Sequence, residues 1–284
     1  MMKKLRIGWI GLGKMGIPMV QNLINAGYPL GIYNKTKGKA TKWADQDVKE
    51  LSSPANLLID SDVVILMVSD DAAINEIFTH NDGLLSPNTS GKIIINMSTV
   101  SPAISKEMAL LCEQNGNTYI DAPVSGSVKQ ATEGTLVIMA GGDDQSFEKV
   151  LPIFNVLGKF ALKVGKNGAG NSAKLAINTM LALHAQALAE TILFAKQQGI
   201  ATADLMELIN NSALGNAFIK IKGEAVLKDN YDAAFALKHI VKDLGLAKDE
   251  GLDSPLANAT NQSFQNAAPN FAEEDIIAII KAIG

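Results

Sequence analysis

A chain of 284 residues with 47% hydrophobic and 19% charged residues has room for two domains of ordinary size, and this composition excludes an intrinsically disordered protein. The net charge of −4, with acidic and basic residues interleaved, argues against nucleic acid as a partner. The single cysteine, Cys112, excludes an internal disulfide, and no apolar stretch is long enough to cross a bilayer, so we expect a cytoplasmic protein with no membrane partner.

The first half of the chain alternates short apolar runs with amphipathic stretches. Strands are predicted at Leu5–Ile10, Leu30–Tyr33, Val63–Val68, Lys92–Asn96, Tyr119–Asp121, Gly134–Ala140 and Lys159–Lys163. Helices are predicted between them at Lys14–Ala26, Gly38–Gln46, Pro54–Ile59, Ala72–Phe78, Ile104–Asn115 and Gln145–Leu157. This alternation indicates βαβ units and a mainly parallel sheet. We expect an α/β domain with a Rossmann-type doubly wound sheet over residues 1–163.

The character of the sequence changes near Gly165. Residues Asn171–Gln198 contain no glycine or proline and are rich in Ala and Leu, so they predict one long helix of about 40 Å. Further helices are predicted at Thr202–Ser212, Ala236–Lys248, Ser254–Ala267 and Glu273–Ala282. We expect an all-α domain over residues 164–284, joined to the first by the long helix. A helix this apolar needs more cover than one small domain supplies, which favours a homodimer or homotetramer.

A glycine-rich turn, Gly11-Leu12-Gly13-Lys14-Met15-Gly16, follows the first strand and opens the first helix. In such a turn the first glycine permits the bend, the second lets the backbone approach a pyrophosphate, and the third allows close packing of helix and strand. The helix N-terminus presents unpaired N–H groups to the anion. A tight turn without a ligand is the alternative, but the flanking strand and helix are the context that the dinucleotide-binding motif requires.

The end of the second strand indicates which dinucleotide binds. NAD sites place an Asp or Glu there for the ribose hydroxyls, whereas this chain has Tyr33-Asn34-Lys35-Thr36-Lys37. An acid would repel a 2′-phosphate, while Lys35, Lys37 and the Thr36 hydroxyl would attract it. The alternative is that the lysines belong to a solvated helix start. The sequence favours NADP (NADPH) over NAD.

The segment Asp121-Ala122-Pro123-Val124-Ser125-Gly126-Ser127 ends a predicted strand. Open α/β folds bind ligands at this carboxyl edge of the sheet. The hydroxyls and backbone N–H groups of Ser125, Gly126 and Ser127 would suit a substrate carboxylate. Taken alone, the segment is equally well a polar turn.

Lys174 and Asn178 are four residues apart in the predicted long helix, so they share one helix face. We place Lys174 in the first turn of this helix. The helix dipole and a partly buried site would both disfavour a positive charge there, which would favour proton transfer from the amine. Asn178 could orient the lysine or the substrate. The alternative is a solvated lysine without a catalytic role.

Together these motifs resemble the β-hydroxyacid dehydrogenase family, which includes 3-hydroxyisobutyrate dehydrogenase, tartronate semialdehyde reductase and glyoxylate/succinic semialdehyde reductase. The matching segments follow the family order and are Gly11–Gly16, Asn96-Met97-Ser98-Thr99, Asp121–Ser127, Gly168–Asn178 and Lys242-Asp243-Leu244. The Ser125-Gly126-Ser127 form and the missing acid after the second strand are most similar to the glyoxylate/succinic semialdehyde reductase branch.

The resemblance implies roles for individual residues. Lys174 would be the general acid in reduction, protonating the nascent alkoxide as hydride arrives from nicotinamide. Ser125, Gly126 and Asn178 would hold a small carboxylate-bearing substrate. Outside the glycine turn, the residues implied to contact the nucleotide are Asn34, Lys35, Thr36, Val68, Ser69, Thr99 and Lys242. Imine-reducing relatives usually lack the lysine, which favours carbonyl chemistry, and no metal is expected.

Three functions stay open. The first is an NADP-dependent reductase of small aldehydes or keto acids. The second is a 3-hydroxyisobutyrate or other 3-hydroxy-acid dehydrogenase that works mainly in the oxidative direction. The third is a non-catalytic nucleotide-binding module, against which the presence of Lys174 and Asn178 argues.

Overall fold

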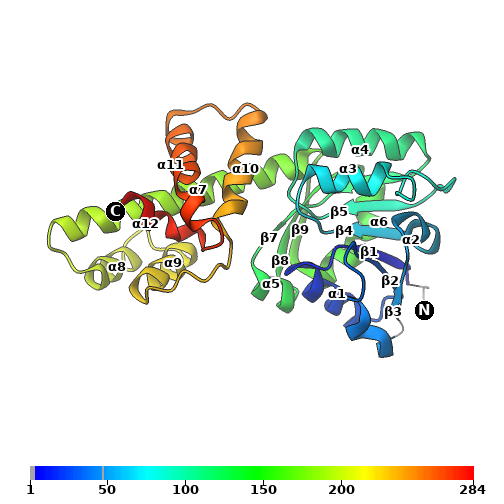
Figure 1. The fold of residues 1–284 in the computed structure, drawn as a ribbon, viewed down its shortest axis with the longest axis horizontal. Helices are drawn as coiled ribbons and strands as arrows, with labels where there is room; N and C mark the ends of the chain where they lie inside the picture. The colour runs from blue at the N-terminus through cyan, green and yellow to red at the C-terminus, as the bar shows by residue number, and fades with distance from the viewer. Residues whose placement is uncertain (1–3, 47) are drawn as a thin grey trace. The chain divides into compact units, whose positions relative to one another are not determined.

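The computed structural model describes residues 4–46 and 48–284, and residues 1–3 and 47 lie outside the described part. The chain divides into two compact units, Met1–Lys174 and Leu175–Gly284. The first is an α/β unit and the second is helical (Figure 1), so the predicted fold class is confirmed. The division falls inside the long helix α7 (Ala169–Gln197), which begins in the first unit and continues into the second.

A nine-stranded sheet forms the centre of the first unit, in the order β3-β2-β1-β4-β5-β6-β8-β7 with β9 paired to β8. The strands are β1 (Ile7–Ile10), β2 (Leu30–Tyr33), β3 (Val48–Glu50), β4 (Val63–Leu66), β5 (Ile93–Asn96), β6 (Thr118–Asp121), β7 (Val124–Ser125), β8 (Leu136–Gly141) and β9 (Gly158–Gly165). Neighbours from β3 to β6 are parallel, whereas β8 is antiparallel to β6 and β7. The strand order reverses direction between β1 and β4, which is where open α/β sheets bind ligands.

Helices cover both faces of this sheet. They are α1 (Gly16–Asn25), α2 (Pro54–Asp60), α3 (Asp71–Thr79), α4 (Pro102–Gln114), α5 (Val128–Glu133) and α6 (Asp144–Leu157), together with the 3-10 helix η1 (Thr41–Gln46). Figure 1 shows α3 and α4 on one side of the strands and α1 and α5 on the other. Successive strand residues point to opposite faces. Trp9 and Ile65 therefore pack in the α1/α6 core, while Ile10 and Leu66 pack in the α2/α3/α4 core.

The sequence does not predict β3, β7 or α5, and it predicts an α-helix at Gly38–Gln46 where the chain forms a 3-10 helix. β3 and β7 contain three and two residues, which is too short to show a hydrophobic period. In η1 the backbone N–H of Trp43 bonds the carbonyl of Ala40, and its buried indole donates to Gln21 Oε1 at 2.7 Å. The indole anchors the Thr41–Gln46 segment in the core, and this contact stabilises the 3-10 helix there instead of an α-helix.

The second unit contains helices and one isolated backbone bridge, Ala236 to Asp275. After α7 its helices are α8 (Thr202–Asn210), α9 (Ala217–Leu227), α10 (Leu237–Asp249), α11 (Pro255–Phe271), the 3-10 helix η2 (Ile276–Ala278) and α12 (Ile279–Ile283). Helix α9 was not predicted from the sequence. Alanines of α7 pack with Phe264 of α11 and the isoleucines of η2 and α12 in one core. Of the helices that the structure describes, none combines the length and apolar character that spanning a bilayer requires.

An ion pair lies inside this helical core. The Lys222 ammonium of α9 is 2.7 Å from Asp275 Oδ1 and 2.9 Å from Oδ2, and the two side chains are only 9% and 3% exposed. Asp275 also accepts from the backbone N–H groups of Ala234, Phe235 and Ile277. The carboxylate therefore ties α9 and the segment before α10 to the start of η2.

We predict that Asp275→Asn lowers the free energy of unfolding by about 3–5 kcal/mol, because it leaves the Lys222 ammonium buried without its counter-charge. Urea unfolding followed by circular dichroism measures the loss. The matched control is Lys228→Ala, which removes an exposed pair with Glu224 at 3.6 Å and should cost less than about 1 kcal/mol. Equal losses of unfolding free energy in the two variants would show that the buried pair contributes no more to stability than the exposed pair.

Candidate active site

Five strand ends form one row at the carboxyl edge of the sheet. Tyr33 pairs with Ile10, Ile10 with Leu66, Leu66 with Asn96, and Asn96 with Asp121. Because the strands are parallel, the segments that follow them leave the sheet side by side. The register therefore brings together the predicted glycine turn, the segment after β2 and the polar segments after β4, β5 and β6.

Packing inside the protein explains two glycines of the turn after β1. Gly11 has φ = 102°, and a Cβ there would collide with the Met67 carbonyl oxygen. A Cβ on Gly16 would collide with the Gly11 carbonyl oxygen, since α1 packs directly against the end of β1. A Cβ on Gly13, in contrast, would have no described protein atom within 4 Å. Packing within the described chain therefore does not require glycine at position 13.

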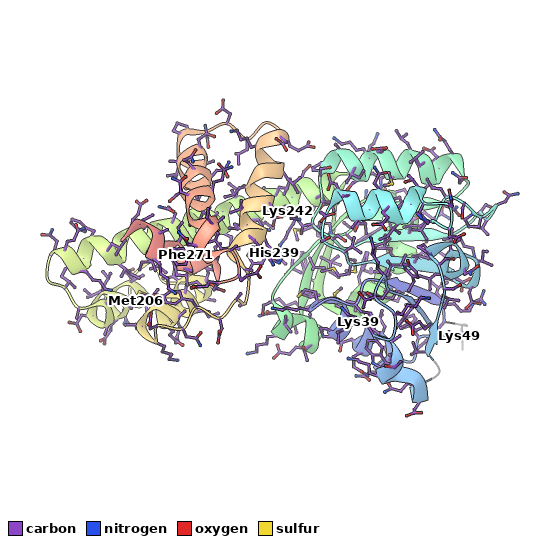
Figure 2. All side chains as sticks on the ribbon, viewed as in Figure 1. Lys39, Lys49, Met206, His239, Lys242 and Phe271 are labelled. Carbon is purple, nitrogen blue, oxygen red and sulfur yellow. The ribbon has the colours of Figure 1, made fainter. Side chains whose placement is uncertain are left out.

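Asn34 links the two segments predicted to bind the cofactor. Its Oδ1 accepts from the backbone N–H of Leu12 at 2.8 Å, and its Nδ2 donates to the Thr36 carbonyl at 2.7 Å. The Lys39 ammonium, labelled in Figure 2, lies 3.4 Å from the Leu12 carbonyl. Asn34 therefore holds the glycine turn and the segment after β2 next to each other, a structural role that the sequence does not predict.

Lys35 is held by an acidic side chain from another element. Its ammonium lies 2.7 and 2.8 Å from the two carboxylate oxygens of Glu76, in the middle of α3. The hydrogen bond to Glu76, reinforced by the charge of the carboxylate, raises the pKa of Lys35. No acid follows β2 in the sequence, and the acid that contacts Lys35 lies 41 residues further along the chain, so it was not predicted. Lys37 is exposed.

Buried and partly buried hydrogen bonds connect the ends of β4, β5 and β6. The Ser98 hydroxyl accepts from the Val68 backbone N–H at 2.9 Å, and Asn96 Oδ1 accepts from the Ser98 N–H at 3.0 Å. Asn96 Nδ2 in turn donates to the Tyr119 hydroxyl at 3.0 Å. The segments containing Val68-Ser69 and Thr99 are thereby fixed next to each other, as a shared nucleotide-binding role would require.

The three residues of the predicted substrate cradle have different local surroundings. Ser125 ends β7, and Gly126 has φ = 139°, a conformation that strongly favours glycine. Ser127 is the N-cap of α5, and its hydroxyl donates to Gln130 Oε1 at 2.7 Å. The cap therefore gives Ser127 a structural role, and Ser125 and Gly126 are the stronger candidates for contact with substrate.

Lys174 lies in α7 with only 7% of its surface exposed. The helix begins at Ala169, not at Asn171 as predicted, so Lys174 is in its second turn and the placement in the first turn was wrong. The earlier start follows from Asp121, at the end of β6, whose carboxylate accepts from the backbone N–H groups of Gly168 and Asn171. These bonds fix the start of the lysine-bearing helix at the carboxyl edge of the sheet.

Asn178 is buried one turn after Lys174, and its Nδ2 donates to Asp243 Oδ2 at 2.5 Å. A carboxylate only accepts hydrogen bonds, so the amide NH2 must face Asp243. The Lys242 ammonium is 3.2 Å from the other oxygen of Asp243, and Lys242 lies with His239 on α10 (Figure 2). Asp243 thus contacts two predicted site residues. From the sequence, Asp243 was recognised only as part of the Lys242-Asp243-Leu244 motif.

Cys112 and His239 carry reactive groups that lie outside the predicted set of site residues. Burial raises the pKa of the Cys112 thiol to about 12, so this side chain is packed and unreactive. Desolvation, with the charges of Lys238 and Lys242, lowers the pKa of His239.

Across residues 4–46 and 48–284, no group of three or more His, Cys, Asp or Glu residues is arranged to hold a metal ion.

Two family models together match almost the whole chain. Residues 6–168 match the NAD-binding domain of 6-phosphogluconate dehydrogenase. Residues 168–283 match a model described as NAD-binding of NADP-dependent 3-hydroxyisobutyrate dehydrogenase.

Similar proteins are named as reductases and dehydrogenases of small hydroxy acids. Glyoxylate/succinic semialdehyde reductase 1 of Arabidopsis thaliana is 32% identical over 284 residues, which is 98% of each chain. The 2-hydroxy-3-oxopropionate reductase of Escherichia coli K12 is 32% identical over 285 residues, 98% of this chain and 97% of the relative. The solved structure of a Mycobacterium tuberculosis 3-hydroxyisobutyrate dehydrogenase with L-serine has a TM-score of 0.89 at 28% identity, covering 99% of each chain. The predicted family is confirmed: the chain belongs to the β-hydroxyacid dehydrogenases and is an NAD(P)-dependent oxidoreductase.

Proposed function

We propose that this protein is an NADP(H)-dependent reductase of small carboxylate-bearing aldehydes or keto acids, similar to the glyoxylate/succinic semialdehyde reductases, with Lys174 as its general acid. The observation that carries the proposal is the burial of Lys174 on a helix whose start is fastened to the end of β6. A lysine with a solvated surface role would extend into water instead. The two relatives at 32% identity that are named as reductases support the same chemistry.

The turn after β1 fits the pyrophosphate of a dinucleotide. Gly13 lies in the loop before α1, where an added Cβ would meet no described protein atom within 4 Å, so the space beside its backbone is open to a ligand. Within the described chain, no side chain caps the start of α1. The Ile17 N–H bonds the Gly13 carbonyl and residue 18 is a proline, so the N–H groups of the turn itself would have to meet an anion. Gly11–Gly16 would hold the pyrophosphate, and Lys35, Thr36 and Lys37 would hold a 2′-phosphate.

The remaining nucleotide contacts would come from Val68, Ser69, Thr99 and Lys242. Bound NADPH would supply a hydride to the carbonyl carbon of the substrate. The ammonium of Lys174 would deliver a proton to the carbonyl oxygen as negative charge develops there, so that an aldehyde plus hydride and proton gives an alcohol.

The substrate carboxylate would bind at Ser125 and Gly126. Because Asp243 holds the amide NH2 of Asn178, the carbonyl oxygen of this amide is the group available to accept a hydrogen bond from Lys174 or the substrate. Asp243 would therefore fix the orientation in which Asn178 enters the reaction. The presence of both Lys174 and Asn178 argues against a non-catalytic nucleotide-binding module.

The second candidate is a 3-hydroxyisobutyrate or other 3-hydroxy-acid dehydrogenase. The similarity to the 3-hydroxyisobutyrate dehydrogenase of Mycobacterium tuberculosis favours it. The same residues would act in reverse, with neutral Lys174 accepting the proton of the substrate hydroxyl. Direction and substrate thus distinguish the two candidates, whereas the site residues are shared.

We further propose a homodimer or homotetramer in the cytoplasm. Large apolar side chains of α7 and α8, including Met180, Phe194 and Leu208, are exposed on the second unit, which supports burial against another copy of the chain. The free, buried Cys112 is compatible with a reducing compartment.

We predict NADPH-dependent reduction of glyoxylate and succinic semialdehyde at higher kcat/KM than NAD(P)-dependent oxidation of 3-hydroxyisobutyrate. A spectrophotometric panel of these three substrates with both cofactors at one fixed pH measures the difference.

We predict that Lys174→Ala lowers kcat by a factor on the order of 100 or more, because the developing oxyanion loses its proton donor. The Kd for NADPH should stay within about twofold of wild type, since NADPH is bound chiefly by other residues. Full activity of this variant would remove Lys174 from the mechanism.

We predict that Glu76→Gln tightens NADPH binding by roughly two- to tenfold and leaves NADH binding unchanged. The carboxylate both occupies the Lys35 ammonium and would repel a 2′-phosphate. Fluorescence titration with the two cofactors measures this. Glu113→Gln, at an exposed position of α4, is the control and should change neither affinity. A parallel change for NADPH and NADH would contradict a contact to the 2′-phosphate.

We predict that Gly13→Ala and Gly16→Ala fail in different ways. The methyl of Gly13→Ala meets no described protein atom within 4 Å, so this variant should keep the wild-type melting temperature and lose NADPH affinity by about tenfold or more. Gly16→Ala should lower the melting temperature, because its methyl collides with the Gly11 carbonyl. Calorimetry and NADPH titration separate the two effects. Undiminished NADPH binding by folded Gly13→Ala would place the pyrophosphate elsewhere.

A further inference from the structure

The start of α7 is capped by a carboxylate from a distant part of the chain. Asp121 is the last residue of β6, and its side chain is fully buried. Its Oδ1 accepts from the Gly168 N–H at 2.8 Å and its Oδ2 from the Asn171 N–H at 2.9 Å. Helices usually take their N-terminal cap from a residue at the helix start. Here the cap comes from 47 and 50 residues away, so it joins a strand of the sheet to the helix that carries Lys174.

The surroundings of Asp121 are shaped for a carboxylate. A Cβ at Gly141 would lie 2.6 Å from Oδ1, and one at Gly170 would lie 2.9 Å from Oδ2. Both oxygens therefore depend on neighbouring glycines for room. Burial raises the pKa of Asp121, and the backbone N–H groups of Asn171, Gly168 and Gly170 oppose that rise. Since a buried carboxylate is costly, these N–H donors are what make the arrangement stable.

A second tie acts on the same helical turn. The side chain of Asn171 accepts from the Val100 N–H at 3.0 Å through Oδ1 and donates to the Ser105 hydroxyl at 3.1 Å through Nδ2. Val100 follows the Ser98-Thr99 segment after β5, and Ser105 is a buried residue of α4. The first turn of α7 is thus fixed at three points, to β6, to the loop after β5 and to α4.

We propose that Asp121 is a positioning residue for the reaction, which sets the place of the Lys174 ammonium relative to the carboxyl edge of the sheet. Lys174 follows Asn171 by three residues in the same helix, so less than one helical turn separates it from the capped N–H group. This inference rests on the proposed function of Lys174. A displacement of about 1 Å in an active site can cost on the order of 100-fold in rate, which makes this anchoring relevant to turnover.

The test replaces Asp121 by Asn, which keeps the size of the side chain but turns one acceptor oxygen into an NH2 that faces a backbone N–H. We expect kcat to fall by about 10- to 100-fold, with KM and the NADPH Kd within about threefold of wild type. The matched control is Asp143→Asn: Asp143 is an exposed cap of α6 that accepts from the Ser146 N–H at 2.8 Å. This control should keep the wild-type kcat, because α6 carries none of the proposed site residues.

Amide hydrogen exchange gives a readout that does not require activity. In Asp121→Asn the amides of residues 168–174 should exchange faster than in wild type, and in Asp143→Asn they should not. If Asp121→Asn does not fold, Asp121→Ser takes its place, because the smaller side chain removes both carboxylate acceptors and adds no bulk beside Gly141 and Gly170. A lower kcat with intact NADPH binding in Asp121→Ser supports the positioning role.

The proposal is overturned if a folded Asp121→Asn enzyme, or its substitute Asp121→Ser, retains a kcat within twofold of wild type. It is also overturned if exchange over residues 168–174 is unchanged. Failure of the proposed function has a different signature, since the wild-type enzyme would then reduce none of the panel substrates or Lys174→Ala would stay active. The Asp121 variant can therefore fail its test while the assignment of Lys174 stands.

Discussion

The parallel register of β2, β1, β4, β5 and β6 is the constraint on which the rest of the first unit depends. It ends five strands in one row, and each following segment starts from that row. The strands are buried on both faces, so a shift by one residue would exchange the two cores and bring Trp9 to the face of Ile10. Hydrophobic packing therefore fixes the strand register. The register in turn determines where the polar groups at the strand ends lie, although packing itself has no preferred direction and their hydrogen bonds do.

Directional contacts then complete what packing begins. Asn34 joins the glycine turn to the segment after β2, Ser98 joins the ends of β4 and β5, and Asp121 joins β6 to α7. Each contact uses a side chain to satisfy a backbone N–H group that would otherwise lack a partner in a partly or fully buried place. The segments at the carboxyl edge therefore form a connected polar layer on top of an apolar sheet, which is what a rigid site for a charged dinucleotide needs.

The second unit also contains buried polar contacts, and these involve charged side chains. Its core holds the Lys222–Asp275 pair, and Asp243 bonds Asn178 in a second buried contact. A buried carboxylate is expensive unless its partners satisfy it, so both acids are supported by donors from other helices. One pair serves the fold of the helical unit, and the other orients a residue of the proposed site. Both contacts therefore follow the rule that a buried carboxylate needs partners, although one stabilises the fold and the other orients Asn178.

The sequence by itself determined the order of the elements, the glycine turn after β1, the missing acid after β2 and the paired Lys174 and Asn178. These features are local, because a turn, a strand period or a spacing of four residues is set by neighbours along the chain. The elements that it did not predict include the short β3, β7 and α5 and also α9, an ordinary helix of 11 residues. At Thr41–Gln46 tertiary packing outweighs the local preference and gives a 3-10 helix.

Only the tertiary structure decided which polar groups meet. Glu76 reaches Lys35 across 41 residues, Asp121 reaches Gly168 across 47, and Asn178 reaches Asp243 across 65. Each contact depends on the order of the strands or on the packing of helices, and neither leaves a periodic trace in the sequence. The physical reason is that an apolar pattern specifies which face of an element is buried, whereas a hydrogen bond also requires a particular partner at about 3 Å.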